Sequence, residues 1–145
     1  MTHYTPESFS LTQSVGFLLT KARNLITAEM DTALKDLDIT GPQMGIILAM
    51  QRGQAATPFE LSKMLSVDTG LMTRMLDKLE TKGLLERSRS VDDRRVVNLE
   101  LTKKGETIAG EIPKIAPEVL NARLKKFTKA EFEELGRLLD KFIGE

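Results

Sequence analysis

Cysteine is absent from this 145-residue sequence, and histidine occurs once, as His3. Without cysteine the chain has no disulfide, no thiolate metal site and no thiol nucleophile. His3 lies close to a chain terminus, where backbones fray, so it is a poor candidate for a general base or a metal ligand. The sequence also lacks a glycine-rich phosphate loop that ends in Gly-Lys-Ser or Gly-Lys-Thr. We therefore expect no enzyme activity, no metal site and no cofactor.

Long apolar runs and an excess of charge of one sign are missing as well. The apolar runs fall far short of the roughly 20 residues that span a bilayer, and the first residues show no secretory signal. These features predict a cytoplasmic protein without membrane contact. Lys and Arg together number 21, as do Asp and Glu, so the net charge is zero and only a local cluster of cations could attract an anionic partner. Hydrophobic residues make up 41% of the chain, which is enough for one globular domain.

Four Ser or Thr residues are each followed three positions later by Gln or Glu, the pattern of a capping box at a helix start. The four segments are Ser10–Gln13, Thr40–Gln43, Thr57–Glu60 and Thr128–Glu131. After Ser10, apolar residues at spacings of three and four predict one long helix that reaches Leu37. After Thr40, they predict a short, buried helix that ends at Gly53.

Two further helices are predicted between residues 57 and 83. The first begins after Thr57 and breaks at Ser66 and Val67. The second begins at Asp68, a good N-cap whose charge suits the positive end of a helix, and ends at Gly83. Its apolar face is formed by Met72, Met75, Leu76 and Leu79.

Beyond Gly83 the apolar spacing changes to the period of two that is typical of strands. Residues 84–89 and 96–101 are predicted to be two strands, joined by a polar loop. Two helices with a tight turn, followed by a hairpin, are the order of a winged helix-turn-helix. The predicted fold class is therefore mainly α with a small β-hairpin (α+β). In such a fold the second helix enters the major groove of DNA and the hairpin reaches a neighbouring groove.

The face of the second helix opposite its apolar residues carries groups suited to DNA. This face presents Thr69, Gly70, Thr73, Arg74 and Asp77, and Lys78 lies beside it. Threonine hydroxyls bond phosphates or bases, glycine lets the backbone come close, and Arg74 can pair with guanine through two hydrogen bonds. Arg74 is therefore the first candidate for reading bases. The alternative is that it only solvates the helix surface or pairs with a carboxylate such as Asp77.

Arginines on the predicted hairpin favour an interface with nucleic acid. They are Arg87, Arg89, Arg94 and Arg95. With Arg74 they can form one cationic surface. Asp92 and Asp93 oppose that charge at the hairpin tip, and we interpret them as partners that hold the arginines, so that one of these can enter a narrow minor groove. The candidate DNA contacts are Thr69, Gly70, Thr73, Arg74, Lys78, Arg87, Arg89, Arg94 and Arg95.

These segments resemble the MarR family of bacterial transcriptional regulators between Leu61 and Gly105. The resemblance rests on Leu61-Ser62, Thr73-Arg74-Met75-Leu76-Asp77-Lys78-Leu79-Glu80, Lys82-Gly83-Leu84-Leu85-Glu86-Arg87, Asp92-Asp93-Arg94-Arg95 and Leu101-Thr102-Lys103-Lys104-Gly105. It implies a homodimer whose terminal helices interlock, with Arg74 in the recognition helix and Arg94 in the minor groove. Arg95 would brace the hairpin. The expected parts are a dimerisation segment (1–39), a DNA-binding lobe (40–102) and C-terminal dimerisation helices (103–145).

The C-terminal part of the chain is predicted to contain two helices. Thr102 caps the first, in which Pro113 and Pro117 predict a kink or a break. The second, after Thr128, carries an apolar stripe of Phe132, Leu135, Leu139, Phe142 and Ile143. This stripe is more apolar surface than one small domain easily covers, so a second copy could bury it. A two-fold dimer predicts an inverted-repeat operator in double-stranded DNA. The alternative is that the stripe packs only within its own chain.

Regulation by a ligand is implied by the resemblance alone. Members of the family often release DNA when a small aromatic or phenolic compound binds between the dimerisation helices and the DNA-binding lobe. The residues that could line such a cavity are Phe9, Phe17, Met44, Ile47 and Leu48, although each also suits a core position.

Two functions therefore remain open. The first is a dimeric DNA-binding regulator, expected to be a repressor that a ligand releases. The second is a winged-helix module for protein interaction, in which the arginines contact an acidic partner. The zero net charge is compatible with both.

Overall fold

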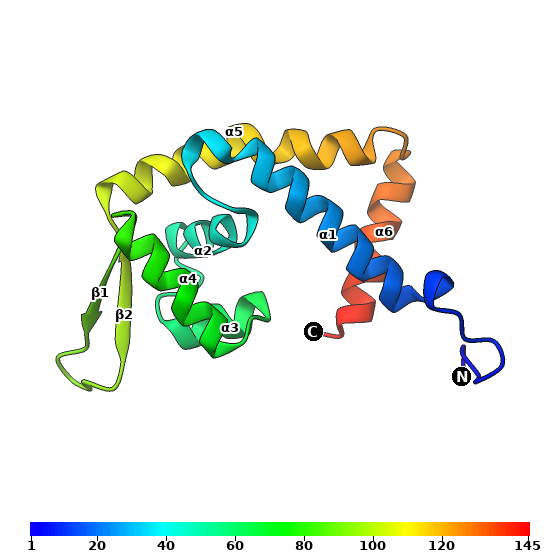
Figure 1. The fold of residues 1–145 in the computed structure, drawn as a ribbon, viewed down its shortest axis with the longest axis horizontal. Helices are drawn as coiled ribbons and strands as arrows, with labels where there is room; N and C mark the ends of the chain where they lie inside the picture. The colour runs from blue at the N-terminus through cyan, green and yellow to red at the C-terminus, as the bar shows by residue number, and fades with distance from the viewer.

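The structure, a computed structural model, describes residues 1–145 and is mainly helical with one two-stranded sheet, as the sequence predicts. Its elements are η1 (Leu11–Gln13), α1 (Val15–Ala33), η2 (Lys35–Leu37), α2 (Gly41–Gln51), α3 (Pro58–Leu65), α4 (Thr69–Thr81), β1 (Leu85–Arg89), β2 (Val97–Leu101), α5 (Lys103–Leu124) and α6 (Lys129–Ile143). In Figure 1, α5 runs along the top with α1 and α6 below its right-hand half, and α2, α3, α4 and the hairpin gather on the left. None of these helices has the length and apolar character needed to cross a bilayer.

The N-terminal helix is shorter than predicted at both ends. Ser10 makes no side-chain cap, and α1 begins instead after Ser14, whose Oγ accepts a hydrogen bond from the Phe17 amide at 3.1 Å. At the other end the chain tightens into the 3₁₀ turn η2, and Asp38 follows in the left-handed region with φ 55°. The prediction of one helix from Ser10 to Leu37 was wrong because a serine in extended conformation interrupts it at position 14.

The other predicted helix starts are confirmed. Thr40 and Gln43 form a complete capping box, with the Gln43 amide 3.3 Å from Thr40 Oγ1 and the Thr40 amide 3.1 Å from Gln43 Oε1. Thr128 and Glu131 form a second one at α6. Thr57 caps α3, and Asp68 caps α4. These short-range bonds fix where the two helices of the helix-turn-helix begin.

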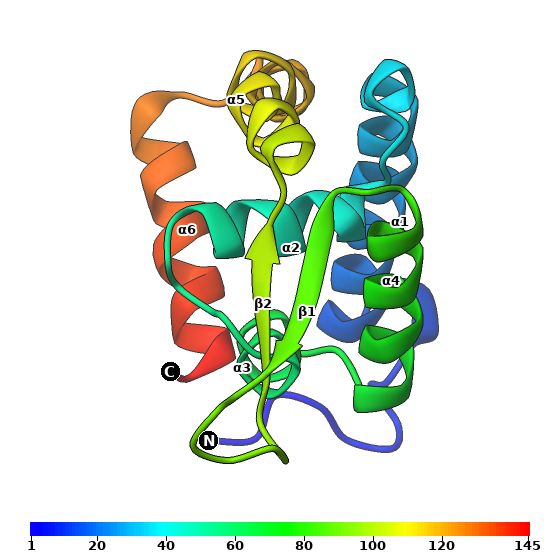
Figure 2. The same cartoon turned by 90° about the vertical axis from the view of Figure 1, so that its left-hand side faces the viewer.

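The hairpin, which we call the wing (residues 85–101), joins α4 to α5. Its strands pair antiparallel, from Leu85 opposite Leu101 to Arg89 opposite Val97. The Leu99 amide donates to the Ala56 carbonyl at 2.8 Å, which ties the wing to the loop between α2 and α3. Figure 2 shows the two strands beside α4. The predicted strands are confirmed to within one residue.

Of the kink or break predicted in α5, the break does not occur. The helix is continuous from Lys103 to Leu124 although Pro113 and Pro117 lie inside it. Both prolines are exposed. Solvent can therefore reach the carbonyl groups that lose an N–H partner, which lowers the cost of an interior proline.

The core lies in the left-hand part of Figure 1, where α2, α3 and α4 meet α1, the wing and the first half of α5. Its largest fully enclosed side chains are Leu34, Ile46, Ile47, Leu61, Met72, Leu76, Leu79, Leu85 and Ile112. By contrast, α6 has no buried residue. Phe132 and Phe142 on its apolar stripe are 53% and 63% exposed, so the alternative in which this stripe packs within its own chain is wrong.

Gly105 allows the first turn of α5 to pack against the start of the wing. A β-carbon added there would lie 2.0 Å from the backbone oxygen of Leu84. The same corner is held by Thr102, whose hydroxyl donates to the Gly83 carbonyl at 2.6 Å. Glycine is thus required at position 105 because the backbone of α5 passes too close to the backbone of Leu84 for a side chain to fit.

Gly105→Ala is expected to lower the free energy of unfolding by about 1 to 3 kcal/mol, because the backbone must shift to admit the methyl group. Gly110→Ala on the same helix is the matched control, since nothing lies within 4 Å of an added β-carbon. There alanine should stabilise the helix by roughly 0.5 to 1 kcal/mol. Urea unfolding followed by circular dichroism measures both variants. Equal stabilities would contradict the close approach.

Candidate nucleic-acid interface

Helix α4 presents the polar face that its periodicity predicts. Met72, Met75, Leu76 and Leu79 are buried. All five candidate DNA contacts of this helix are exposed: Thr69, Gly70, Thr73, Arg74 and Lys78. The helix is therefore rotated so that its polar face points away from the core.

Arg74 is free to bind a partner. Its guanidinium group makes no ion pair with any carboxylate of the chain, and Asp77 is bound to Arg87 instead. The alternative that Arg74 pairs with Asp77 is therefore wrong. A β-carbon on Gly70 would lie 3.6 Å from Arg74 Nη1 and 3.2 Å from the Asp68 carboxylate. Glycine at this position leaves room for the arginine over the first turn.

Thr69 and Thr73 are not equivalent on this face. The Thr73 hydroxyl donates to the Thr69 carbonyl at 2.9 Å, so in this rotamer only its lone pairs are available to a partner. A phosphate oxygen needs a donor. Thr73 would therefore have to rotate to bind a phosphate, whereas the Thr69 hydroxyl makes no bond within the chain.

The tip of the wing is built from paired groups around one free arginine. Arg95 donates to Asp93 from Nε at 3.1 Å, from Nη2 at 3.3 Å and from its backbone amide at 3.0 Å. Arg89 Nη1 donates to the Arg94 carbonyl at 2.7 Å. The side chain of Arg94 is exposed and makes no ion pair. The tip is thus organised by Arg89, Asp93 and Arg95, and Arg94 extends from it.

Arg87 differs from the other candidates because its charge is already compensated. Its guanidinium group binds the Asp77 carboxylate, and its Nε lies 3.8 Å from Glu80 Oε1. Both carboxylates belong to α4, whereas Arg87 belongs to β1. Arg87 therefore connects the wing to α4.

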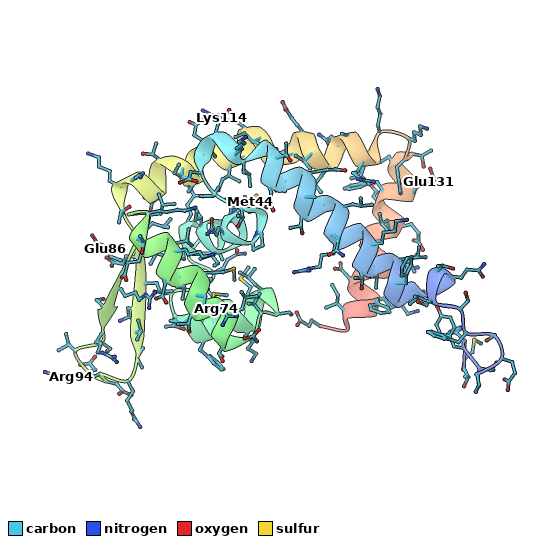
Figure 3. All side chains as sticks on the ribbon, viewed as in Figure 1. Met44, Arg74, Glu86, Arg94, Lys114 and Glu131 are labelled. Carbon is cyan, nitrogen blue, oxygen red and sulfur yellow. The ribbon has the colours of Figure 1, made fainter.

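The cationic candidates consequently fall into two groups. Arg74, Lys78 and Arg94 have no partner in the chain, whereas Arg87, Arg89 and Arg95 are bound to carboxylates or a carbonyl. Figure 3 shows Arg74 on α4 and Arg94 at the wing tip on the lower side of the molecule, with Lys114 of α5 on the opposite side. Arg74 and Arg94 thus lie on one side of the molecule.

Lys82 makes contacts that the sequence does not predict. At the end of α4, its Nζ donates to the Asp38 carbonyl at 2.5 Å and lies 3.4 Å from Gln43 Oε1. Lys104 Nζ donates to the Lys82 carbonyl at 3.1 Å. The end of α4 is therefore tied both to the segment between α1 and α2 and to α5. A lysine in a last helical turn predicts only a favourable charge, not this partner.

A cavity of about 250 Å³ lies between α1 and the helices of the lobe. It is lined by Arg23, Ile26, Thr27, Met30, Gly41, Pro42, Met44, Gly45, Leu65, Val67 and Met75. Of the five residues predicted to line a ligand cavity, Met44 alone lines this one. Ile47 is fully enclosed in the core, Leu48 packs against it, and Phe9 is exposed. Phe17, half-buried on α1, does not reach the cavity either.

The ion pair at the wing tip has a measurable consequence. The side chain of Arg95, and then its amide, lower the pKa of Asp93 below the ordinary aspartate value. A carboxyl group with a lowered pKa stabilises the folded turn above its ordinary pKa, and this contribution is lost as the pH falls through the lowered value.

Arg95→Ala is expected to raise the pKa of Asp93 back toward the ordinary aspartate value, because the largest cause of the shift is removed. Carbon-detected NMR titration of the side-chain carboxyl group measures it. Arg94→Ala is the control, since that side chain does not bind Asp93. An Asp93 pKa that stays low in the Arg95 variant would disprove the assigned pair.

Comparison with known proteins supports one family. A model of the MarR family matches residues 39–97. The Multiple antibiotic resistance protein MarR of Escherichia coli (strain K12) is 38% identical over 111 residues, which cover 76% of this chain and 77% of the relative. The Organic hydroperoxide resistance transcriptional regulator of Bacillus subtilis (strain 168) is 31% identical over 99 residues, or 68% of this chain and 67% of the relative.

Solved structures agree with this match. A mutant MarR from E. coli complexed with operator DNA has a TM-score of 0.81 and 32% identity, and the alignment covers 88% of this chain and 92% of that one. BpsR of Bordetella bronchiseptica shares the fold, with a TM-score of 0.83 at 24% identity over 94% of this chain and 98% of that one. On these grounds the chain belongs to the MarR family of winged-helix transcriptional regulators.

Proposed function

We propose that this chain is a dimeric, sequence-specific DNA-binding regulator that acts as a repressor. The observation that carries the proposal is the presence of unpaired Arg74 and Arg94 on one side of the molecule, on α4 and at the wing tip. The complex of E. coli MarR with operator DNA supports it, because that protein is similar over 88% of this chain.

Each exposed group has a role in this proposal. Helix α4 would enter the major groove, where Arg74 donates two hydrogen bonds to a guanine. Thr69 and Lys78 would contact phosphates, and Gly70 would let the backbone come close. Arg94 would enter the minor groove, whose negative potential is strongest where it is narrow. Because the net charge of the chain is zero, these few cations would supply the local attraction.

The dimer would be formed by the terminal helices. The apolar stripe of α6 is uncovered within one chain, and α1 adds Leu18 and Leu25, which are 53% and 39% exposed. A two-fold axis would bury this surface against its counterpart. It would also place two copies of α4 in successive major grooves, roughly 10 base pairs apart, on an inverted repeat.

Protein interaction is the rival function, because exposed arginines also bind acidic proteins. Salt dependence separates the two, since each phosphate contact releases a counterion and steepens the logarithmic slope of affinity against salt. The test is to measure the affinity for the DNA upstream of the chain's own gene, and for random DNA, at a series of salt concentrations. A shallow slope on both would favour the protein partner.

Arg74→Ala is expected to weaken specific binding by about 1 to 3 kcal/mol and to relax the base preference, whereas Arg94→Ala should reduce the salt slope by about one. Footprinting and fluorescence anisotropy measure these quantities. Lys114→Ala, on the opposite side of the molecule, is the control and should bind as the wild type does. Unchanged binding by the Arg74 variant would show that Arg74 does not read bases.

We further propose that a small aromatic or phenolic acid releases the DNA by binding in the 250 Å³ cavity. Two features support this. The walls come from α1 and from the lobe, so a ligand can sense their spacing, and Arg23 supplies an unpaired cation beside apolar side chains. In BpsR, which shares the fold, DNA binding is regulated by 6-hydroxynicotinic acid.

An aromatic acid that fits the cavity is expected to weaken DNA binding by about 5- to 150-fold, the usual range of coupling between sites. Arg23→Met should remove this response and leave DNA binding without ligand intact. Lys35→Met, another exposed cation near the lobe, is the control. Benzoate, salicylate and hydroxynicotinate would be titrated into the protein–DNA complex. A full response in the Arg23 variant would place the ligand elsewhere.

A further inference from the structure

An ionic contact joins α4 to the middle of strand β1. Arg87 on β1 binds Asp77 of α4 and approaches Glu80 one turn further along. Its Nε is fully buried and makes no hydrogen bond, with the Glu80 carboxylate 3.8 Å away. The guanidinium group is thus held between two carboxylates of the helix.

A cavity lies beside this contact, and apolar residues also line it: Leu76 of α4, Val97 of β2 and Pro58. The cavity has a volume of about 370 Å³ and separates α4 from the strands, with Thr73 on the helix side and Arg87, Ser88 and Arg89 on the strand side. Space beside a contact removes the dispersion attraction that packed atoms would supply. The base of the wing is held by the buried Leu85 and Leu99 and by the bond from the Leu99 amide to the Ala56 carbonyl, and Arg87 adds an ionic link from β1 directly to α4.

A second bond continues from Arg87 toward the wing tip. Arg89 is two residues further along β1 and so lies on the same face of the strand as Arg87. It donates to the Arg94 carbonyl at 2.7 Å. The backbone of Arg94 is thereby linked, through β1 and Arg87, to the helix that carries Arg74.

We propose that Arg87 is a positioning residue that holds the wing at a fixed distance from α4, so that Arg74 and Arg94 bind DNA as one unit. It does this without contacting the DNA itself. The effect of Arg87 on DNA binding rests on the proposed function. The sequence pattern had placed Arg87 among the candidate DNA contacts.

Charge explains why Arg87 does not serve as a phosphate contact. Its single positive charge faces two carboxylates, so a phosphate brought to it would also meet Asp77 and Glu80. A compensated arginine adds no counterion release. The pair is partly exposed, at 26% for Arg87 and 59% for Asp77, and such pairs contribute little to global stability. Removing it should move the wing without unfolding the chain.

The first test is Arg87→Met, which keeps the apolar stem and removes the charge. Operator binding should weaken roughly tenfold, because residues in direct contact typically interact by about 0.5 to 3 kcal/mol and tenfold corresponds to a value within that range. The slope of affinity against salt is measured in the triple variant described next, which has no uncompensated carboxylates, and it should stay at the wild-type value. A slope reduced by about one would overturn the proposal, because it would show that Arg87 contacts a phosphate.

Removing Arg87 also leaves two uncompensated carboxylates near the DNA, and a control separates this effect. The triple variant Arg87→Met with Asp77→Asn and Glu80→Gln has no such excess charge but still lacks the link. It should remain weaker than the wild type. Full recovery of affinity in the triple variant would overturn the proposal in favour of simple charge compensation.

The second test measures coupling between the two DNA-reading residues. If Arg74 and Arg94 act as one unit, the losses caused by Arg74→Ala and Arg94→Ala should be non-additive in the wild-type background. In the Arg87→Met background the same two losses should become additive. Equal coupling in both backgrounds would contradict the role of Arg87.

A measurement on the free protein separates this proposal from the proposed function. Hydrogen exchange of the wing amides (residues 85–101) should be faster in Arg87→Met than in the wild type, with α2 and α5 unchanged. If no DNA were bound by either protein but the wing exchanged faster, the proposed function would fail and the positioning of the wing would stand. Unchanged exchange would overturn the positioning role whether or not DNA is bound.

Discussion

Burial of one face of α4 is the constraint on which the rest of the interface depends. Met72, Leu76 and Leu79 are almost fully enclosed, and each such side chain contributes about 1.5 to 3 kcal/mol. Rotating the helix by one residue would expose these side chains and turn charged ones toward the core, where an unpaired charge costs far more. The rotation of α4 is therefore fixed by its apolar side chains, and the exposure of Arg74 is a consequence of that packing.

Acidic residues then decide what each arginine does. In a chain of zero net charge, a carboxylate that pairs with an arginine compensates a charge that a partner could otherwise use. Asp92 at the wing tip makes no ion pair, so its predicted role as a partner that holds an arginine was wrong. Asp77 pairs with Arg87, and Asp93 pairs with Arg95, so the charge of each of these arginines is compensated by a carboxylate. Both pairs fix geometry instead: one between helix and wing, the other within the wing tip. Arg94 has no such carboxylate and keeps its charge for a partner.

Local signals in the sequence predicted most of the fold, and non-local contacts explain what they missed. The caps at Thr40, Asp68 and Thr128 depend on residues three positions apart, which a sequence displays directly. The prediction of where α1 begins was wrong because Ser10 and Ser14 both offer a capping oxygen, and the sequence alone does not show which of the two caps the helix. The candidate DNA contacts of α4 lie on its exposed face, as its periodicity predicts. The partner of Arg87 belongs to another element, α4, and the pattern of the strand carries no information about it.

The cavity and the interface share α4, and this connects the two proposed activities physically. Met75 belongs to the buried face of α4 and also lines the cavity, opposite Met30 of α1. The far end of α4 is held by Lys82 to the segment that joins α1 to α2. A molecule that pushed Met75 away from α1 would therefore act on a helix anchored at one end, and would tilt it. Because Arg87 ties the wing to the same helix, a tilt of α4 would displace Arg74 and Arg94 together.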